Sequence, residues 1–240
     1  DLTELFLEVG SAAAEDGSGI AFFLDEVQFV REVEYRALIS ALHRSTQKQL
    51  PITAAAAGLP QIPRLSGEAR SYAERLFTFP EIANLDSEAT ASAFVEPARR
   101  EGVEYAAEAL TEAVAWTQGY PFYIQQLGKH VWNRADASPI NPETVLGAEP
   151  AAQHALDTSI YQVRLQRSTP SERQYMRAMA SLGAGPYRSG DIAKHLKRPV
   201  NALSPVREAL LTKGLAYATE DYGYLDFTIP RFDEFLRRTQ

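Results

Sequence analysis

The chain has 240 residues, of which 45% are hydrophobic and 23% are charged, a composition that is ordinary for a globular protein with a buried core. Its net charge of −7 is uneven, because residues 168–240 carry 11 Lys and Arg against 8 Asp and Glu, whereas residues 1–167 carry 13 against 23. The absence of cysteine excludes disulfides, thiol catalysis and cysteine-based zinc sites, and the absence of a long apolar run predicts no membrane partner and a cytoplasmic location.

The first 60 residues alternate between helix and strand patterns. Asp1 and Glu4 have the spacing of a capping box, which predicts a helix start. The apolar run that ends at Leu24 is typical of a strand buried on both faces of a parallel sheet. A strand-helix-strand unit of this spacing predicts a parallel α/β sheet. The expected elements are a helix over 2–14, a strand over 20–24, a helix over 31–49 and a strand over 52–57.

Helical patterns dominate after this unit. We expect Pro150 to kink or split a long helix, because proline lacks the amide hydrogen of the helical hydrogen bond. The chain is therefore divided into a partial sheet domain, residues 1–83, and a helical domain, residues 84–167. The expected elements are a short helix over 68–76, a strand over 77–79, and helices over 85–99, 103–116, 121–134 and 141–167.

Residues 168–240 have a pattern of their own. The joint Glu220-Asp221-Tyr222-Gly223 is typical of a hairpin turn. Three helices followed by a hairpin predict a winged helix-turn-helix domain. The expected elements are helices over 171–182, 189–196 and 200–213, and strands over 215–219 and 224–229.

Two acids, Asp25 and Glu26, follow the first predicted strand. Such a pair suits nucleotide hydrolysis, since one carboxylate can hold the water shell of Mg²⁺ and the other can activate the attacking water. The C-terminal edge of a parallel sheet is also where ligands bind in open α/β folds. The pair is equally compatible with a polar strand end whose acids are only solvated. The four histidines show no metal-ligand spacing.

The residues around this pair resemble a known family. IAFFLDEVQ, residues 20–28, is similar to the Walker B stretch of prokaryotic AAA+ ATPases related to the STAND NTPases and to archaeal origin-recognition initiators. Further landmarks follow in the family's order: Gly58-Leu59-Pro60 after a strand, SYAERLF at 71–77, and Gly119-Tyr120-Pro121 at a helix start. The resemblance covers nearly the whole chain. It implies an α/β fold: a partial parallel-sheet P-loop ATPase core with a helical lid, followed by a winged helix.

The resemblance also implies roles for individual residues. Asp25 matches the acid that binds magnesium through water, and Glu26 matches the water-activating acid. Arg75 lies where the family has a candidate arginine finger or phosphate sensor, and it is equally compatible with a surface arginine paired to an acid. Gly119-Tyr120-Pro121 matches a turn that approaches the base and ribose, and is also compatible with a simple helix start. Thr53 is the only polar residue of the sensor strand, and its early position departs from the family's pattern.

A phosphate-binding loop of the form GxxxxGK[ST] is absent from the sequence. The single Gly-Lys pair, Gly128-Lys129, lies in a predicted helix. Since the family has this loop N-terminal to the Walker B strand, we hypothesise that the chain is a truncated part of an ATPase. ATP and Mg²⁺ are expected cofactors of the full-length protein. We expect neither tight binding nor appreciable hydrolysis of ATP by this chain alone.

The C-terminal domain is the basic part of the chain. Between residues 188 and 213, six basic residues stand against two acids. Cations around the second and third helices of a helix-turn-helix neutralise DNA phosphates and place the third helix in the major groove. A protein-interaction winged helix with solvated lysines is the alternative. Expected contacts to double-stranded DNA are Arg188, Lys194, Lys197, Arg198, Asn201, Ser204 and Arg207.

Two functions therefore compete. In the first, an ATP-dependent regulator couples its nucleotide state to a winged helix that binds DNA or a protein. In the second, a non-enzymatic DNA-binding or protein-interaction module is carried by a degenerate ATPase scaffold. The expected partners are duplex DNA, another protein or a second copy of the chain. A phosphate-binding loop upstream of Asp1 would favour the first function.

Overall fold

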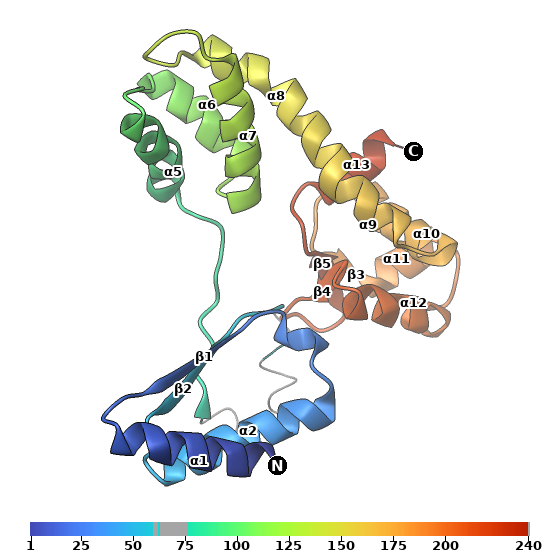
Figure 1. Cartoon of the computed structure of the whole chain (residues 1–240). Helices are drawn as coiled ribbons and strands as arrows, with labels where there is room; N and C mark the ends of the chain where they lie inside the picture. The colour runs from blue at the N-terminus through green and yellow to red at the C-terminus, as the bar shows by residue number, and fades with distance from the viewer. Residues whose placement is uncertain (60–61, 63–75, 240) are drawn as a thin grey trace. The chain divides into compact units, whose positions relative to one another are not determined.

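A computed structural model describes residues 1–59, 62 and 76–239 (Figure 1). They form a mixed α/β protein that is mostly helical and has a small parallel sheet. The chain divides into two compact units, residues 1–81 with 217–221 and residues 82–216 with 222–240.

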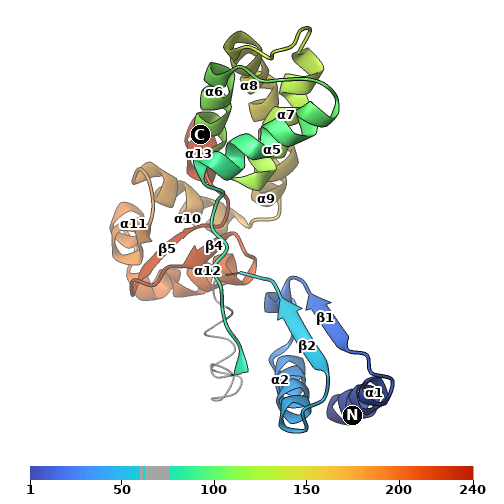
Figure 2. The ribbon, with the colours of Figure 1, turned by 90° about the vertical axis from the view of Figure 1, so that its left-hand side faces the viewer.

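The first unit is built on two parallel strands. β1 and β2 pair from Ile20 with Ile52 to Leu24 with Ala56 (Figure 2). The predicted capping box is confirmed, since the Glu4 amide donates to Asp1 Oδ1 at 2.9 Å. The elements are α1 (Leu2–Glu15), β1 (Ile20–Leu24), the short helix η1 (Val27–Phe29), α2 (Glu32–Gln47) and β2 (Ile52–Ala56).

Helices α1 and α2 cover one face of this sheet. Phe22 of β1 stacks on Phe6 of α1 with ring centroids 4.8 Å apart, and Phe6 shares a small core with Ala41 and Leu42 of α2. The prediction that the first strand is buried on both faces is wrong, because Phe23 is 83% exposed. The two helices lie on one side of the strands, so successive side chains alternate between covered and open positions.

A bundle of four helices begins the second unit. Its core contains Phe94, Leu127 and Val145 from three of these helices. The predicted helix over 103–116 starts later, because Tyr105 instead forms an isolated bridge with Ile140. The helices are α5 (Ser87–Arg100), α6 (Ala107–Thr117), α7 (Pro121–Arg134) and α8 (Pro142–Leu156).

Two expectations about irregular segments are contradicted. Pro150 does not split the helix, because α8 continues through it, and the irregular turn comes later, as the π-helix η2 (Asp157–Tyr161) before α9 (Gln162–Gln166). Buried residues on both sides of the proline, such as Ala148 and Ala152, keep the helix packed, so one missing hydrogen bond is tolerated. Residues 77–79 form no strand, and the helix predicted over 68–76 lies almost entirely outside the described residues.

The C-terminal elements of the second unit surround a three-stranded sheet of order β3-β5-β4. Strand β3 and helix α13 were not expected, although Phe232, Phe235 and Leu236 have helical spacing and are buried. The elements are α10 (Pro170–Ser181), β3 (Tyr187–Arg188), α11 (Ser189–His195), α12 (Val200–Thr212), β4 (Ala216–Ala218), β5 (Tyr224–Phe227) and α13 (Phe232–Arg238).

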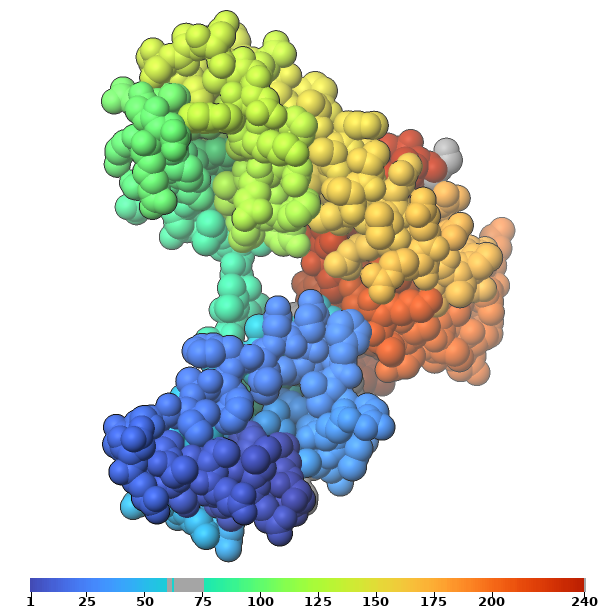
Figure 3. Space-filling view, in the orientation of Figure 1, coloured from blue at the N-terminus to red at the C-terminus, as the bar shows by residue number. Residues whose placement is uncertain are grey.

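The helical bundle and the C-terminal elements share one hydrophobic core. Tyr123 of α7 and Tyr161 of η2 are fully buried in it, and both hydroxyls lie within hydrogen-bond distance of each other and of the Pro230 carbonyl. One hydroxyl can donate to the other while the second donates to this carbonyl. The guanidinium of Arg231 lies 5.0 Å from the centre of the Trp116 ring. Helix α8 runs from the bundle towards these elements, as the yellow surface in Figure 3 shows. Residues 84–167 thus lie in one compact unit with residues 168–216 and 222–240.

Burial of the Tyr161 and Tyr105 phenols makes the free energy of unfolding depend on pH in the alkaline range. Burial raises the pKa of Tyr161 to about 12 and that of Tyr105 to about 12, against about 10 in an unfolded chain. Between pH 10 and 12 the two phenols have lost their protons in the unfolded chain but keep them in the folded chain. Their contribution to the free energy of unfolding is therefore fully present below pH 10 and is lost as the pH rises towards 12. We expect denaturant titrations to show this loss, and Tyr105→Phe to reduce it. A flat stability from pH 9 to 11.5 would contradict the prediction.

Candidate functional site

Asp25 and Glu26 directly follow β1, at the carboxyl end of the parallel pair. Strand pairing continues up to them, because the Ala57 amide donates to the Leu24 carbonyl at 2.8 Å. Glu26 has a left-handed backbone with φ 54°, and its amide donates to Asp25 Oδ1 at 2.8 Å. This conformation is uncommon for a residue with a side chain. It ends the strand abruptly and leaves both acids exposed at the edge of the sheet.

Gln28 links Glu26 to the segment that follows β2. Its side-chain NH₂ donates to the Glu26 carboxylate, and its Oε1 accepts from the Leu59 amide at 3.2 Å. Gly58 leaves space for the side-chain amide of Gln28, since a Cβ on Gly58 would lie 2.4 Å from Gln28 Oε1. Gln28 is the last residue of the stretch 20–28 that resembles a Walker B segment, but the sequence pattern alone predicts no separate role for it.

We expect replacement of Gln28 to loosen this link without unfolding the unit. Gln28→Ala removes the acceptor of the Leu59 amide, so hydrogen exchange at that amide should accelerate at least tenfold. The Val27 amide is an internal control, because it donates to the Ala57 backbone carbonyl and does not depend on Gln28. Exchange that is unchanged at Leu59, or equally accelerated at both amides, would show that Gln28 is not a specific link.

The acid pair can hold a hydrated cation. Carboxylate oxygens suit Mg²⁺, which commonly keeps several of its water ligands. Among the described residues no group of three or more His, Asp or Glu side chains is arranged to bind a metal. Glu26 lies next to Asp25 and is restrained by Gln28, which places a second carboxylate beside the same edge.

Thr53, another predicted nucleotide contact, lies on the same sheet but away from the acid pair. Thr53 pairs with Ala21 and is exposed, three residue pairs before the strand end, which is about 10 Å at the usual rise of a strand. Arg75 lies outside the described residues.

Gly119-Tyr120-Pro121 has a structural role in the second unit. Gly119 has φ 73°, and a Cβ on it would lie 2.0 Å from the Leu85 carbonyl oxygen. The Leu85 amide in turn donates to the Gly119 carbonyl at 2.9 Å. Pro121 is the first residue of α7, where its missing amide hydrogen is not needed. The close approach of the segment before α5 therefore explains the glycine without a ligand.

The predicted DNA-binding residues lie around α11 and α12. Asn201 and Ser204 are exposed and three residues apart, so they share one face of α12. Lys194 is exposed and pairs with Asp191 at 3.2 Å. Three other exposed cations have no ion pair within the part of the chain that the structure describes: Arg188, Lys197 and Arg198.

Arg207 is separated from this surface. The buried residues Leu203 and Leu210 mark the inward face of α12, and Arg207 lies between them on that side. It is half-buried and lies near Tyr175: burial raises the pKa of that phenol, and the charge of Arg207 partly opposes the rise. Its Nε is buried and has no hydrogen-bond partner among the described residues. Helix packing thus turns Arg207 towards the core side of α12, although it is only three residues along the helix from Ser204.

Comparisons with known proteins matched a family model to part of the chain and found similar solved structures. A family model described as a domain of unknown function, DUF8462, matches residues 158–236. No curated protein matches. Among solved structures, the chain is similar to RuvB of Thermotoga maritima, a Holliday junction branch migration motor, with 19% identity and a TM-score of 0.49 over 94% of this chain and 80% of that chain. A variant of the same protein gives 20% identity and a TM-score of 0.49 over 90% and 69%.

Among the described residues, no helix is both long and apolar enough to cross a membrane.

Proposed function

We propose that Asp25 and Glu26 form the acidic half of an ATP hydrolysis site of the AAA+ kind. The observation that carries this proposal is the position of two exposed acids at the carboxyl end of β1, with β2 parallel beside it. Asp25 would hold Mg²⁺ through water, and Glu26 would orient and deprotonate the attacking water. The sequence resemblance around IAFFLDEVQ supports the same assignment.

The proposed site needs a phosphate-binding loop, which these 240 residues do not contain. ATP hydrolysis at this site therefore requires a phosphate-binding loop in addition to Asp25 and Glu26. Bound Mg²⁺ would neutralise charge on the phosphates. This chain's own residues would contribute the water-held cation site at Asp25, the base at Glu26, and the positioning of Glu26 by Gln28. Arg75 is retained in the proposal as a candidate phosphate-sensing residue.

The two acids have separable roles, which gives a direct test. Asp25→Asn should raise the Mg²⁺ concentration needed for ATP turnover by the protein as the cell synthesises it, because a neutral amide holds a hydrated cation weakly. Glu26→Gln should retain Mg²⁺-dependent ATP binding and lose turnover. Asp16→Asn, an exposed acid at the end of α1, is the matched control and should change neither. Identical behaviour of all three variants would exclude this site.

A second candidate function is DNA binding by the C-terminal elements. It is favoured by exposed cations around α11 and α12 that lack a counter-charge in the described residues. We propose that residues 168–240 form a winged helix-turn-helix with α12 as the helix that enters the major groove. Asn201 and Ser204 would face base edges, and Arg188, Lys194, Lys197 and Arg198 would contact phosphates. Together with a helical lid over 84–167, this gives an ATP-dependent regulator that acts on DNA.

A further inference from the structure

A pocket of about 400 Å³ lies between α10 and the end of α11, and it belongs to neither the acid pair nor the exposed face of α12. Its α10 residues have helical spacing and lie on one side of the helix, since Tyr175, Met176 and Met179 turn into the core. Its lining residues are Gln174, Arg177, Ala178, Ser181, His195, Leu196 and Lys197.

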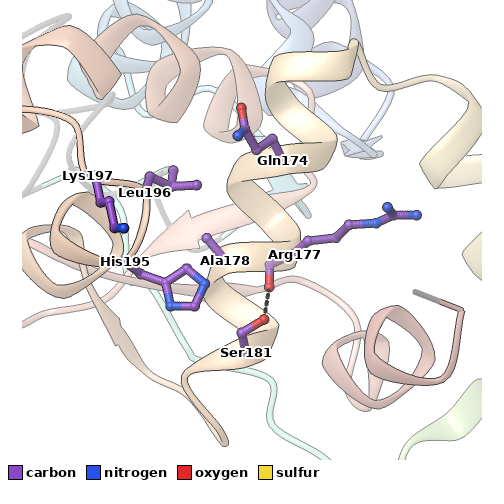
Figure 4. A pocket seen from close by; sticks show the side chains of 7 residues that line it. All are labelled: Gln174, Arg177, Ala178, Ser181, His195, Leu196 and Lys197. Atoms are coloured by element: carbon purple, nitrogen blue, oxygen red, sulfur yellow. Dashed lines mark hydrogen bonds between the residues drawn. The ribbon is translucent and has the colours of Figure 1, made fainter.

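The lining of the pocket contains cations, hydrogen-bond donors and the apolar residues Ala178 and Leu196, but no carboxylate. In Figure 4 the side chains of His195 and Lys197 lie together on one side of α10, whereas the Arg177 side chain extends away from them. Neither Arg177 nor Lys197 forms an ion pair with any residue that the structure describes. The nearby acid Asp191 is paired with Lys194. A concave surface with uncompensated positive charge attracts anions.

The backbone of Lys197 is a second sign that its side chain is used. Lys197 follows the C-terminal cap of α11 and has φ 52°, in the left-handed region. Its amide donates to the Lys194 carbonyl at 3.1 Å, and the Arg198 amide donates to the Ala193 carbonyl at 3.0 Å, which closes the end of the helix. Glycine is the usual residue at such a position because it has no Cβ. A strained residue that lines a pocket points to a functional side chain.

The size and donors of the pocket favour a phosphate group carried by a larger molecule. A lysine ammonium binds phosphate as a point charge, and the Gln174 amide and a His195 ring N–H can each add one hydrogen bond. A volume of about 400 Å³ exceeds that of a single phosphate ion and falls in the range of ligand pockets. Arg198 and Asn201, both exposed, follow Lys197 within four residues. A phosphate here would therefore lie beside the start of α12.

We propose that this pocket binds one phosphodiester group of a nucleic-acid backbone, with Lys197, His195 and Gln174 as its direct contacts. The proposal rests on DNA binding by the C-terminal elements. It adds a phosphate contact from α10, which would restrict the position of α12 along the duplex.

The test measures binding of a 20-base-pair duplex to the 240-residue chain by fluorescence anisotropy between 50 and 200 mM salt. Lys197→Gly removes the ammonium and relieves the left-handed strain, so this variant should melt at or above the wild-type temperature. Its affinity at 50 mM salt should fall about 5- to 10-fold, and its salt slope should fall by about one. Gln174→Ala should weaken binding about threefold without changing the slope, because it removes a neutral donor. Lys129→Ala on α7 removes the same charge elsewhere and should change neither value.

Other outcomes would overturn the proposal in distinguishable ways. If the duplex binds and neither Lys197→Gly nor Gln174→Ala weakens it, the pocket is not a backbone contact and DNA binding stands without it. If the wild-type chain binds no duplex at 50 mM salt, DNA binding and the pocket proposal both fail. If inorganic phosphate or a poly-glutamate peptide shifts the His195 ring signals in NMR while duplex affinity is independent of Lys197, the ligand is a free anion or an acidic protein.

Discussion

Gly119→Ala should lower the unfolding free energy of the second unit by about 2–5 kcal/mol. Two effects add: a left-handed conformation costs a residue with a Cβ about 1–2 kcal/mol, and forced overlap in a packed region costs about 1–3 kcal/mol. The overlap is severe because the Cβ would lie 2.0 Å from the Leu85 carbonyl oxygen, a backbone atom that cannot rotate away. Denaturant unfolding followed by circular dichroism measures this loss.

Gly102→Ala is the matched control for this prediction. Gly102 has the same φ of 73°, but a Cβ on it would meet no atom within 4 Å. This control should therefore show only the conformational cost, about 1–2 kcal/mol. Equal losses in Gly102→Ala and Gly119→Ala would mean that the contact with Leu85 is not what requires the glycine. The structural explanation of the Gly119 turn would then be lost, and its nucleotide role would become the better account.

Replacing Lys194, Lys197 and Arg198 together by alanine should weaken duplex binding about 100-fold at 50 mM salt. All three side chains are exposed at the end of α11 and before α12. Each phosphate contact that is lost removes one released counterion, so the salt slope should fall by about two to three. Anisotropy titrations at several salt concentrations give both values.

The control for this variant keeps the same change in net charge. Arg99, Arg100 and Lys129 are exposed on α5 and α7 of the same unit. Their replacement by alanine should change the salt slope by less than one if the contact is local to α11 and α12. If both triple variants weaken binding equally, the attraction is a general charge effect. The winged-helix function would then be contradicted, and the protein-interaction alternative would remain.

The sequence predicted most elements whose signals are local. Helix α7 has the predicted bounds, Pro121 to Arg134, because proline at its first position marks the start unambiguously. The capping box at Asp1 and the parallel pairing of β1 with β2 likewise follow from short patterns. The capping box depends on neighbouring residues alone, whereas the pairing of β1 with β2 follows from the strand-helix-strand order of three local patterns.

Features set by distant contacts could not be predicted. The continuation of α8 through Pro150 depends on packing against α6 and α7, which outweighs the lost hydrogen bond. The link through Gln28 joins residues 31 positions apart, and the sequence contains no pattern for it. Arg207 is different, because the spacing of Leu203 and Leu210 could have identified the inward face of α12. The cationic DNA contacts are predicted by charge without regard to this periodicity. They therefore include Arg207, which lies on the inward side of α12.

The measurement that tests the central claim most directly is ATP turnover by the protein as the cell synthesises it, with and without Glu26→Gln. We predict Mg²⁺-dependent hydrolysis that this substitution lowers at least about 100-fold, the usual size of a lost general base, while ATP binding is retained. We also predict no appreciable hydrolysis by the 240-residue chain alone. Turnover that does not depend on Glu26, or no turnover by the cellular protein, would contradict the assignment of Asp25 and Glu26 to an ATP hydrolysis site.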